Sequence, residues 1–578
     1  MSDSTQQPIS TQLTQLARDA FQEVFSGTEL DLASIEVVQA TSSEFGDYQC
    51  NSSLSLAKAL KRPPRAIAEA VVGLLEADER VSGIEIAGPG FINFHLEDAW
   101  LARHVNAAAA APHMGVPQIG EGERILMDYG SPNITKPLHI GHLRSHNIGS
   151  TLDRVLRFLG YAVTADNHLG DWGTQFGITL RGWLESGDED RLKHEPMEEL
   201  ERVYVASYER SREDKDWLTE CRETLVRLQS GDAECLRIWQ RFVDLSIEEL
   251  DRIYARIGVT YDLVRGESHY HEKLEPMVGK LIDAGLAQPS EGALVVFLEE
   301  EKLAPCMVRK SDGGFNYATT DLATLESRVA EFNPSKIIYV TDDRQKLHFQ
   351  QVFAISRRLG HTVELIHVAF GLMRLPEATF STREGNVIKL EALLDEAERR
   401  AGDVVRESST DLDSAEQARI AAMVGVGAVK YADLSQNPQS LVTFTWEKAL
   451  SLDGNSAPYL QYAHARICSV LRKFEERFPE ADLTGVVPSL GEPTERDIAV
   501  HLARFPECLV SVAETYRPNL LADYLFELAG RYSRFYQNVP FLKAPEGVRE
   551  SRLRLCQLVL STLRTGLELL GIQAPDRI

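Results

Sequence analysis

The chain lacks paired cysteines and long apolar segments. Its seven cysteines are scattered through 578 residues, and none forms a CxxC pair. An odd, dispersed set of this kind is typical of reduced thiols and predicts no zinc site. No apolar run approaches the roughly 18 residues of a membrane span, and the start MSDSTQQPISTQL lacks the basic and apolar parts of a secretory signal. We therefore expect a cytoplasmic protein without a bound structural metal and without a membrane partner.

Positive charge is also scarce, because 61 lysines and arginines face 86 acidic residues and the formal net charge is −25. This sum does not exclude a nucleic-acid partner, since such binding depends on a local basic face. Hydrophobic residues make up 43% of the chain, as in an ordinary globular protein. The length predicts three or four domains.

The pattern along the chain predicts an α/β fold with a helical end. Residues 1–112 read as an N-terminal α/β module, followed by a small-residue linker. Residues 120–390 alternate strand, glycine-rich turn and helix, which predicts a Rossmann-type, doubly wound parallel sheet. A charge-rich helical insertion interrupts that sheet at about 180–260. The rest is predicted to be a helical linker, 391–440, and an all-helical bundle, 441–578.

Individual strands are predicted from short apolar runs. In the first module these are IEIAG and FINFHL, and in the second ERILMDYG and YAVTADNHLGD. Strand signals return after the insertion in ALVVFL, KIIYVT and VELIHVAFG. From Glu391 onward we find no convincing strand.

The sharpest chemical signal is Pro137-Leu138-His139-Ile140-Gly141-His142, where the first strand of the sheet gives way to a helix. A phosphate group can meet the free amides of a helix N-terminus at such a place. His139 and His142 can both point into one pocket, and Gly141 has no side chain to block a flat base. The arrangement suits ATP, although HxGH alone can also be a pair of unrelated histidines at a helix start.

A second signal lies about 240 residues later in Ser381-Thr382-Arg383, within FSTREGN. A loop of hydroxyl and basic residues there could close over a triphosphate and stabilise charge in the transition state. In isolation the segment reads as a solvated turn. It follows His139-Ile140-Gly141-His142, the HIGH sequence, in the chain and lies on the far side of the predicted sheet. In this order the two segments together indicate an ATP site more strongly than either does alone.

Together these segments resemble the HIGH and KMSKS signatures of class I aminoacyl-tRNA synthetases. SPNITKPLHIGHLRS, NHLGDWGTQFG, DGGFNYATTDLA and STREGNVI resemble the arginyl-tRNA synthetase family, as do SLDGNSAPYLQYAHARI and LGIQAP near the C-terminus. The resemblance implies an arginine–tRNA ligase that activates L-arginine with ATP and Mg²⁺, forming arginyl-adenylate and pyrophosphate. It then transfers arginine to the 3′-terminal ribose of tRNA(Arg). We expect a monomer that forms the adenylate only with tRNA bound.

Specificity for arginine can also be argued from the residues. A guanidinium is always charged and pairs best with carboxylates in a planar, bidentate manner. Tyr317 and Asp321 are four residues apart, so a helix would place them on one face. Without the family context they read as a core aromatic and a surface acid. The resemblance gives the arginine site three more residues, Asp128, Asn133 and Gln345, with His348 beside them.

One feature of the class pattern is absent: the second lysine of KMSKS is not found before Lys389. Arg383 is the cation that the segment offers, and Ser381 and Thr382 are its hydroxyl groups. We expect Lys136, three residues before His139, to stabilise much of the charge on the transferring phosphate.

The resemblance assigns tRNA contacts to both ends of the chain. Residues 1–112 would bind the tRNA elbow through a D-loop base, with Asn93 on the base edge between Phe91 and Phe94. Residues 391–440 would contact the stem, and residues 441–578 would bind the anticodon. The predicted anticodon residues are Tyr459, Tyr462, Arg466 and Tyr536, a set that offers stacking platforms and a cation. Taken alone, the same set could be a core aromatic stripe.

Three other functions compete with this interpretation. A synthetase for cysteine or a large aliphatic amino acid would need zinc-ligand cysteines or a large editing insertion, and the sequence has neither. A non-catalytic tRNA-binding paralogue would explain the altered KMSKS segment but has no use for His139, His142, Tyr317 and Asp321. A general ATP-dependent ligase or nucleotidyltransferase leaves the helical C-terminal third unexplained.

Overall fold

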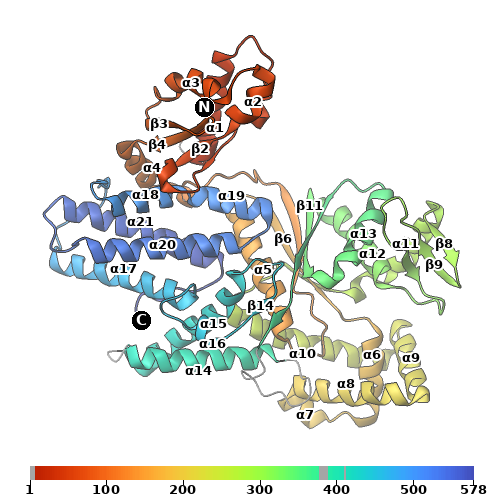
Figure 1. The fold of residues 1–578 in the computed structure, drawn as a ribbon. Coiled ribbons are helices and arrows are strands. Elements are labelled where there is room, and N and C mark those ends of the chain that lie inside the picture. Colours follow the sequence, from red (N-terminus) through yellow and green to blue (C-terminus); the bar gives the residue numbers. More distant parts are fainter. Residues whose placement is uncertain (1–6, 376–387, 409–411) are drawn as a thin grey trace.

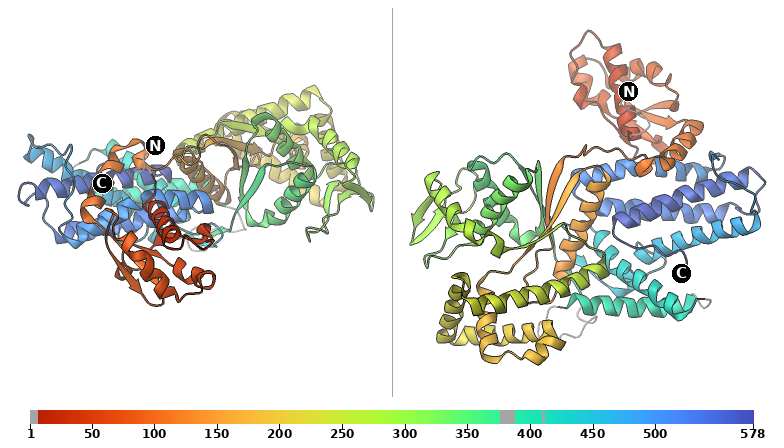
Figure 2. Two further views of the ribbon diagram at one scale, coloured as in Figure 1. Left: turned by 90° about the horizontal axis from the view of Figure 1, so that it is seen from above. Right: turned by 180° about the vertical axis from the view of Figure 1, so that it is seen from behind.

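The computed structural model describes residues 7–375, 388–408 and 412–578. A helical half and an α/β half lie side by side, and the N-terminal module sits over the helical half (Figures 1 and 2). In the part of the chain that the structure describes, no helix is long and apolar enough to cross a membrane.

The N-terminal module is an antiparallel sheet covered by helices. Its strand order is β1-β2-β4-β3, and the predicted runs IEIAG and FINFHL lie in β3 and β4. The strands are β1 Val37–Gln39, β2 Tyr48–Cys50, β3 Val81–Ala87 and β4 Phe91–Leu96. The helices are α1 Ile9–Val24, α2 Ser52–Leu60, α3 Pro64–Leu75 and α4 Asp98–Ala110.

The α/β half is built on the predicted doubly wound sheet. Five parallel strands lie in the order β12-β11-β5-β6-β7, so β5 is central. The chain adds β6 and β7 on one side of β5 and then β11 and β12 on the other, so the strand order reverses between β5 and β11. Ligands of such sheets bind at the carboxyl ends of the strands, at this reversal. The strands are β5 Arg124–Tyr129, β6 Ala162–Leu169, β7 Leu263–Gly266, β11 Lys336–Asp342 and β12 Glu364–Phe370. The helices beside them are α5 Ile140–Phe158, α11 His271–Asp283, α12 Tyr317–Phe332 and α13 Lys346–Arg358.

The first strand signal after the insertion does not return to the parallel sheet. ALVVFL contributes β9, Ala293–Val296, to a separate antiparallel sheet with β8, Ala287–Ser290, and β10, Cys306–Arg309. A short apolar run predicts a buried strand but carries no information on which sheet it joins.

The predicted insertion is helical and ends in one long helix. Its helices are α6 Thr174–Ser186, α7 Glu189–His194, α8 Pro196–Glu213, α9 Lys215–Gln229 and α10 Ala233–Ile257. Because α10 has 25 residues, it extends from the insertion to the helical half, where its C-terminal Ile257 oxygen accepts a hydrogen bond from Lys430.

The C-terminal third is helical with one exception. Its helices are α14 Leu390–Ser408, α15 Ser414–Leu434, α16 Trp446–Ala449, α17 Ala457–Arg477, α18 Pro493–Ala503, α19 Phe505–Thr515, α20 Asn519–Asn538 and α21 Val548–Leu569. The exception is β14, Val442–Thr443, which pairs with β13, Met373–Arg374. Two residues are too few to leave a pattern in the sequence, which explains why no strand was predicted there.

Buried polar contacts fasten the N-terminal module to the helical half. Arg496 on α18 donates to both carboxylate oxygens of Asp47, at 2.9 and 2.7 Å. Glu507 on α19 accepts hydrogen bonds from the Tyr48 hydroxyl and the Gln39 side-chain amide. The module is therefore positioned by the helical half.

Candidate active site

The turn between β5 and α5 is fixed by hydrogen bonds to its backbone. Its amides donate to the side chains of three separate elements: Gly130 to Ser145, Ser131 to Asn167 and Thr135 to Ser246. Ser131 and Thr135 have φ angles of 47° and 66° in the left-handed region, which is costly for residues with a Cβ atom. The surrounding contacts hold the turn in this conformation at the carboxyl end of the central strand.

His139 and His142 form a reciprocal cap at the start of α5. His142 Nδ1 accepts from the His139 amide at 3.1 Å, and His139 Nδ1 accepts from the Gly141 amide at 3.0 Å. Burial is the main cause that lowers the pKa of both rings, so both are neutral near pH 7. Because each Nδ1 is an acceptor, each neutral ring carries its proton on Nε2 and can donate it to a ligand. Gly141 permits this packing, since an added Cβ would lie 2.8 Å from the His139 ring.

The chain returns to this helix start far along the sequence. The Ile140 amide donates to the Ile388 oxygen, and the Leu390 amide donates to the Leu138 oxygen. Residue 388 directly follows the segment that contains Ser381, Thr382 and Arg383, and those three residues lie outside the described part of the chain. The residues that directly follow that segment, Ile388 to Leu390, are thus hydrogen-bonded to the HIGH sequence.

Helix α8 of the insertion contacts two lysines near the histidines. The Lys136 ammonium lies 4.3 Å from the centroid of the Tyr204 ring, within the range of a cation–π interaction. One turn earlier on α8, Glu201 lies 2.8 Å from the Lys389 ammonium. The insertion therefore holds both lysines beside the predicted nucleotide site.

The predicted pair Tyr317 and Asp321 lies in the first turns of α12, as the spacing indicates. Tyr317 is the first residue of the helix and is 72% exposed. One turn later, an Asp321 carboxylate oxygen lies 2.5 Å from His348 Nε2 on α13. His348 thus contacts Asp321 and fixes the orientation of its carboxylate.

Asp128 has a different partner from the one that the sequence predicts. Its carboxylate lies 2.7 Å from the fully buried guanidinium of Arg328, which also bonds Asp166 on β6. Asp128 therefore forms an ion pair with an arginine of the chain itself, Arg328. Arg328 lies two turns beyond Asp321 on α12, so the pair anchors that helix beneath the site.

Glu267 is a carboxylate near Asp321 that sequence reasoning missed. It is partly buried just after β7, and burial followed by the charges of Asp321 and Asp171 raises its pKa to about 7. Among the described residues, no lysine or arginine pairs with Glu267 or Asp321. The one feature of the sequence that could have indicated Glu267 is its place at the carboxyl end of a parallel strand. That strand, β7, has only four residues and is hard to recognise in the sequence.

The other two predicted arginine ligands lie at the edge of the same sheet. Asn133 is exposed in the turn after β5 and pairs with Gly170, where an added Cβ would lie 2.1 Å from its side-chain oxygen. Gln345 is exposed directly before α13, three residues from His348. The structure thus brings the predicted residues to one edge of the sheet.

Comparison with known proteins agrees with this geometry. Residues 104–446 match the sequence model for the catalytic domain of class I (R) tRNA synthetases. Residues 460–578 match the DALR anticodon-binding domain, and residues 11–96 match the arginyl-tRNA synthetase N-terminal domain. The arginine–tRNA ligase of Fusobacterium nucleatum is 40% identical over 97% of this chain and 98% of that protein. The chain belongs to the arginyl-tRNA synthetase family.

Further relatives support this assignment. The arginine–tRNA ligase of Chromobacterium violaceum is 42% identical over 97% of this chain and 98% of its own. The arginyl-tRNA synthetase structure from Plasmodium falciparum has a TM-score of 0.84 at 26% identity, and it covers 99% of both chains. That from Thermus thermophilus has a TM-score of 0.82, also at 26% identity, over 97% of this chain and 99% of that one.

In this family member, three of the four predicted anticodon residues form one surface cluster. The Arg466 guanidinium carbon lies 4.6 Å from the Tyr462 ring centroid and 5.3 Å from that of Tyr536 on α20. Both tyrosines are exposed, at 38% and 39%. We call Tyr462, Arg466 and Tyr536 the α17–α20 cluster.

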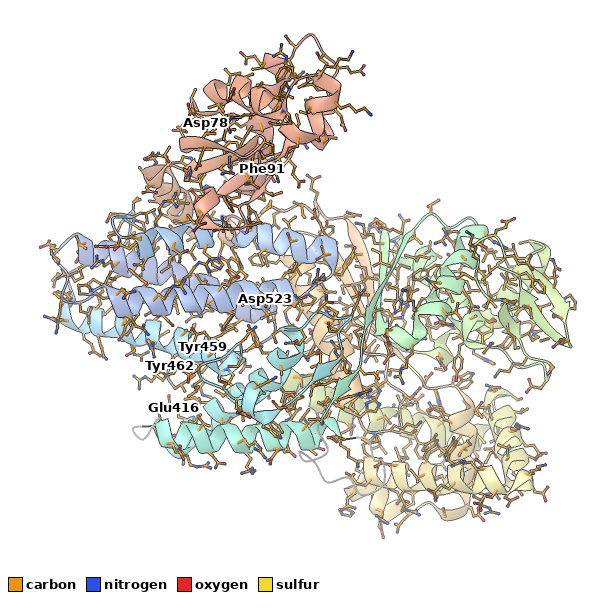
Figure 3. All side chains as sticks on the ribbon, viewed as in Figure 1. Asp78, Phe91, Glu416, Tyr459, Tyr462 and Asp523 are labelled. Carbon is orange, nitrogen blue, oxygen red and sulfur yellow. The ribbon has the colours of Figure 1, made fainter. Side chains whose placement is uncertain are left out.

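Tyr459 is placed differently. Although it lies on the same helix as Tyr462 (Figure 3), it is partly buried against Phe526, at 5.6 Å between ring centroids. Its hydroxyl lies 3.4 Å from the Ser533 hydroxyl. Tyr459 therefore packs α17 against α20, as expected for a core aromatic residue.

Asn93 is also placed differently from the prediction. It is fully buried on β4, and its side-chain oxygen accepts a hydrogen bond from the partly exposed Gln49. A buried amide cannot offer its edge to a base, so Gln49 is the amide of this pair that reaches the surface. Phe91, which Figure 3 labels in the N-terminal module, lies on the same face two residues earlier. Its side chain is partly exposed.

A group of possible metal ligands lies at the C-terminus. His464, Cys468 and Asp576 bring ligand atoms within 4.8 Å of one another. However, the Arg564 guanidinium contacts both His464 and Asp576, and its positive charge disfavours a cation there. His464 also lies 3.2 Å from the Pro575 oxygen. We assign these groups to holding the C-terminal segment against α17 and α21.

Proposed function

We infer that this family member is an arginine–tRNA ligase, and we propose a role for each part of its site. In the first step, the arginine carboxylate attacks the α-phosphate of ATP, forming arginyl-adenylate and releasing pyrophosphate. In the second step, the terminal ribose hydroxyl of tRNA attacks the mixed anhydride and releases AMP. No covalent enzyme intermediate is needed, so the protein acts by positioning and by stabilising charge.

The guanidinium of arginine would bind between Asp321 and Glu267, with Tyr317 at the opening. The observation that carries this proposal is two neighbouring acids without a lysine or arginine partner among the described residues. A bound guanidinium would supply the missing positive charge and accept bidentate pairing. Asp128 would act indirectly, by holding Arg328 and hence α12. Asn133 and Gln345 would hold the α-amino and carboxylate groups.

ATP would bind over the start of α5. The Nε2 protons of His139 and His142 would face the phosphates, and the base would lie against Gly141. Lys136 would stabilise charge on the α-phosphate. Mg²⁺ would enter with ATP as part of the substrate and neutralise its phosphates. Ser381, Thr382 and Arg383 would complete the site from the segment that follows β13.

The tRNA would bind both ends of the molecule. Unpaired anticodon bases would stack on Tyr462 and Tyr536, with Arg466 as the cation. The N-terminal module would receive the tRNA elbow near Phe91 and Gln49. We propose the domain limits 1–112, 120–390, 391–440 and 441–578, a cytoplasmic location and a monomeric state, and these stay predictions.

Arginine-dependent exchange between ATP and pyrophosphate tests the proposed function. We expect exchange with arginine when tRNA is present, much less without tRNA, and none with lysine in place of arginine. Exchange driven by another amino acid would overturn the specificity. Intact tRNA binding without any exchange would favour the non-catalytic paralogue.

A further inference from the structure

Two neighbouring strands of the parallel sheet end beside the proposed arginine pocket. Leu169, the last residue of β6, pairs with Gly266, the last residue of β7. Asp171 follows the first strand and Glu267 follows the second. The turns after β6 and β7 therefore lie against each other at the carboxyl edge of the sheet.

The Asp171 carboxylate holds the turn that carries Glu267. One of its oxygens accepts from the Ser268 amide at 2.8 Å, and the other accepts from the Ser268 hydroxyl at 2.6 Å. Asp171 is only 4% exposed, and a Cβ added to Gly266 would lie 1.9 Å from its carboxylate. The buried Asp171 carboxylate thus lies close to the residues on both sides of Glu267, Gly266 and Ser268.

Asp171 is itself fixed by the insertion. Its backbone oxygen accepts a hydrogen bond from the Trp239 indole on α10 at 2.8 Å. The Glu267 carboxylate, in contrast, has no hydrogen bond or ion pair to any described residue. The position of Glu267 is therefore set by its backbone, and Asp171 sets that backbone through Ser268.

We propose that Asp171 is a positioning residue for arginine specificity, because it holds Glu267 where that carboxylate and Asp321 can share one guanidinium. The inference rests on the proposed role of Glu267. Asp171 also contributes a negative charge that Glu267 feels, as does Asp321. Three acids held close together favour a cationic side chain over a neutral one of the same shape.

The test compares variants by their KM for arginine, their KM for ATP and their kcat, with tRNA present. Asp171→Ala removes both contacts to Ser268 and should raise KM for arginine by about tenfold or more, the effect of losing a charge-assisted hydrogen bond. Its KM for ATP and its kcat should stay within about threefold, since ground-state binding of arginine is what changes. Asp171→Asn keeps the shape and one acceptor, so it should restore most of the arginine affinity.

Charge can be separated from shape with citrulline, the neutral isostere of arginine. The ratio of the citrulline inhibition constant to the arginine KM should fall in Asp171→Asn, because an acid near the pocket is lost. A role in folding alone would lower the melting temperature and leave this ratio unchanged.

Asp214→Ala is the matched control, because Asp214 makes a similar contact to the Trp217 amide far away in the insertion. It should leave KM for arginine unchanged.

Glu267→Gln and Ser268→Ala distinguish the possible failures. If Glu267→Gln leaves KM for arginine unchanged, the proposed role of Glu267 is wrong. If Glu267→Gln raises it but Asp171→Ala does not, the inference about Asp171 is wrong. Should Asp171→Ala fail to fold, Ser268→Ala decides, because it removes only the hydroxyl contact. A selective rise in its KM for arginine supports the inference, and an unchanged value overturns it.

Discussion

The guanidinium of Arg328 lies 2.7 Å from the carboxylate of Asp128, and both side chains are buried beneath the proposed arginine pocket. The same guanidinium bonds Asp166. One arginine thus neutralises two acids from the two central strands and anchors α12, the helix that carries Asp321. We therefore expect the stability of the α/β half to depend on this contact.

Arg328→Met should destabilise the protein strongly. Removing the cation leaves Asp128 and Asp166 buried without a partner, which costs about 3–5 kcal/mol. Thermal unfolding measures the effect. Arg241→Met is the control, because it breaks an exposed pair with Glu189, where the cost is about 1 kcal/mol or less. Equal melting temperatures for the two variants would contradict the structural role of Arg328.

Arginine binding should weaken as the pH falls through 7. Glu267 has a pKa of about 7 in the free protein, owing to burial and to the charges of Asp321 and Asp171. A bound guanidinium favours the carboxylate and so lowers this pKa, which means that binding releases a proton below pH 7. The dissociation constant should then rise by about tenfold per pH unit below 7.

Calorimetry in two buffers with different ionisation enthalpies measures that proton release directly. Glu267→Gln should abolish the release and flatten the pH dependence. In the free protein the raised pKa of Glu267 has the opposite effect on folding stability: its contribution is full below the unfolded pKa of about 4.5 and is lost as the pH rises to 7. Because arginine binds more tightly at the higher pH, it should raise the melting temperature more at pH 8 than at pH 6. An equal shift at both values would contradict the assignment.

The features that could be predicted from the sequence are those that depend on a local pattern of residues, such as an apolar run or a fixed spacing. The central strands of the parallel sheet follow from apolar runs, and the HIGH sequence at the start of α5 follows from its place after β5. Tyr317 and Asp321 share a helix because they are four residues apart. In each case, the information lies within one short segment.

Features that depend on distant partners could not be predicted. Nothing near Asp128 indicates that Arg328, two hundred residues later, takes up its carboxylate. Glu267 follows a strand of four residues, and its importance comes from a neighbour on α12. Tyr459 and Tyr462 are three residues apart on one helix, yet only the packing of α20 decides which of them is exposed.

Lys136→Met should lower arginine-dependent ATP–pyrophosphate exchange by roughly 100- to 1000-fold, the loss typical of one transition-state donor. Tyr204→Leu should raise KM for ATP more modestly, because it removes the ring that holds the ammonium, an interaction of about 0.5–2 kcal/mol. Tyr204→Phe keeps the ring and is the control. A near-normal rate in Lys136→Met would discard the role of Lys136, and equal effects of Leu and Phe would discard that of Tyr204.

The α17–α20 cluster predicts which substitutions weaken tRNA binding. Tyr536→Ala removes an exposed ring that Arg466 covers, so binding should weaken by about 1–3 kcal/mol, the contribution of one stacked base. Arg466→Met should weaken binding and reduce the slope of log affinity against log salt by about 1, since one cation is lost. Tyr459→Phe is the matched control: it keeps the partly buried ring against Phe526 and loses only the hydroxyl contact to Ser533. Filter binding with tRNA at several salt concentrations measures all three. If Tyr459→Phe weakened binding as much as Tyr536→Ala, the Tyr459 hydroxyl would contact the tRNA. The tRNA-binding surface would then extend beyond the α17–α20 cluster.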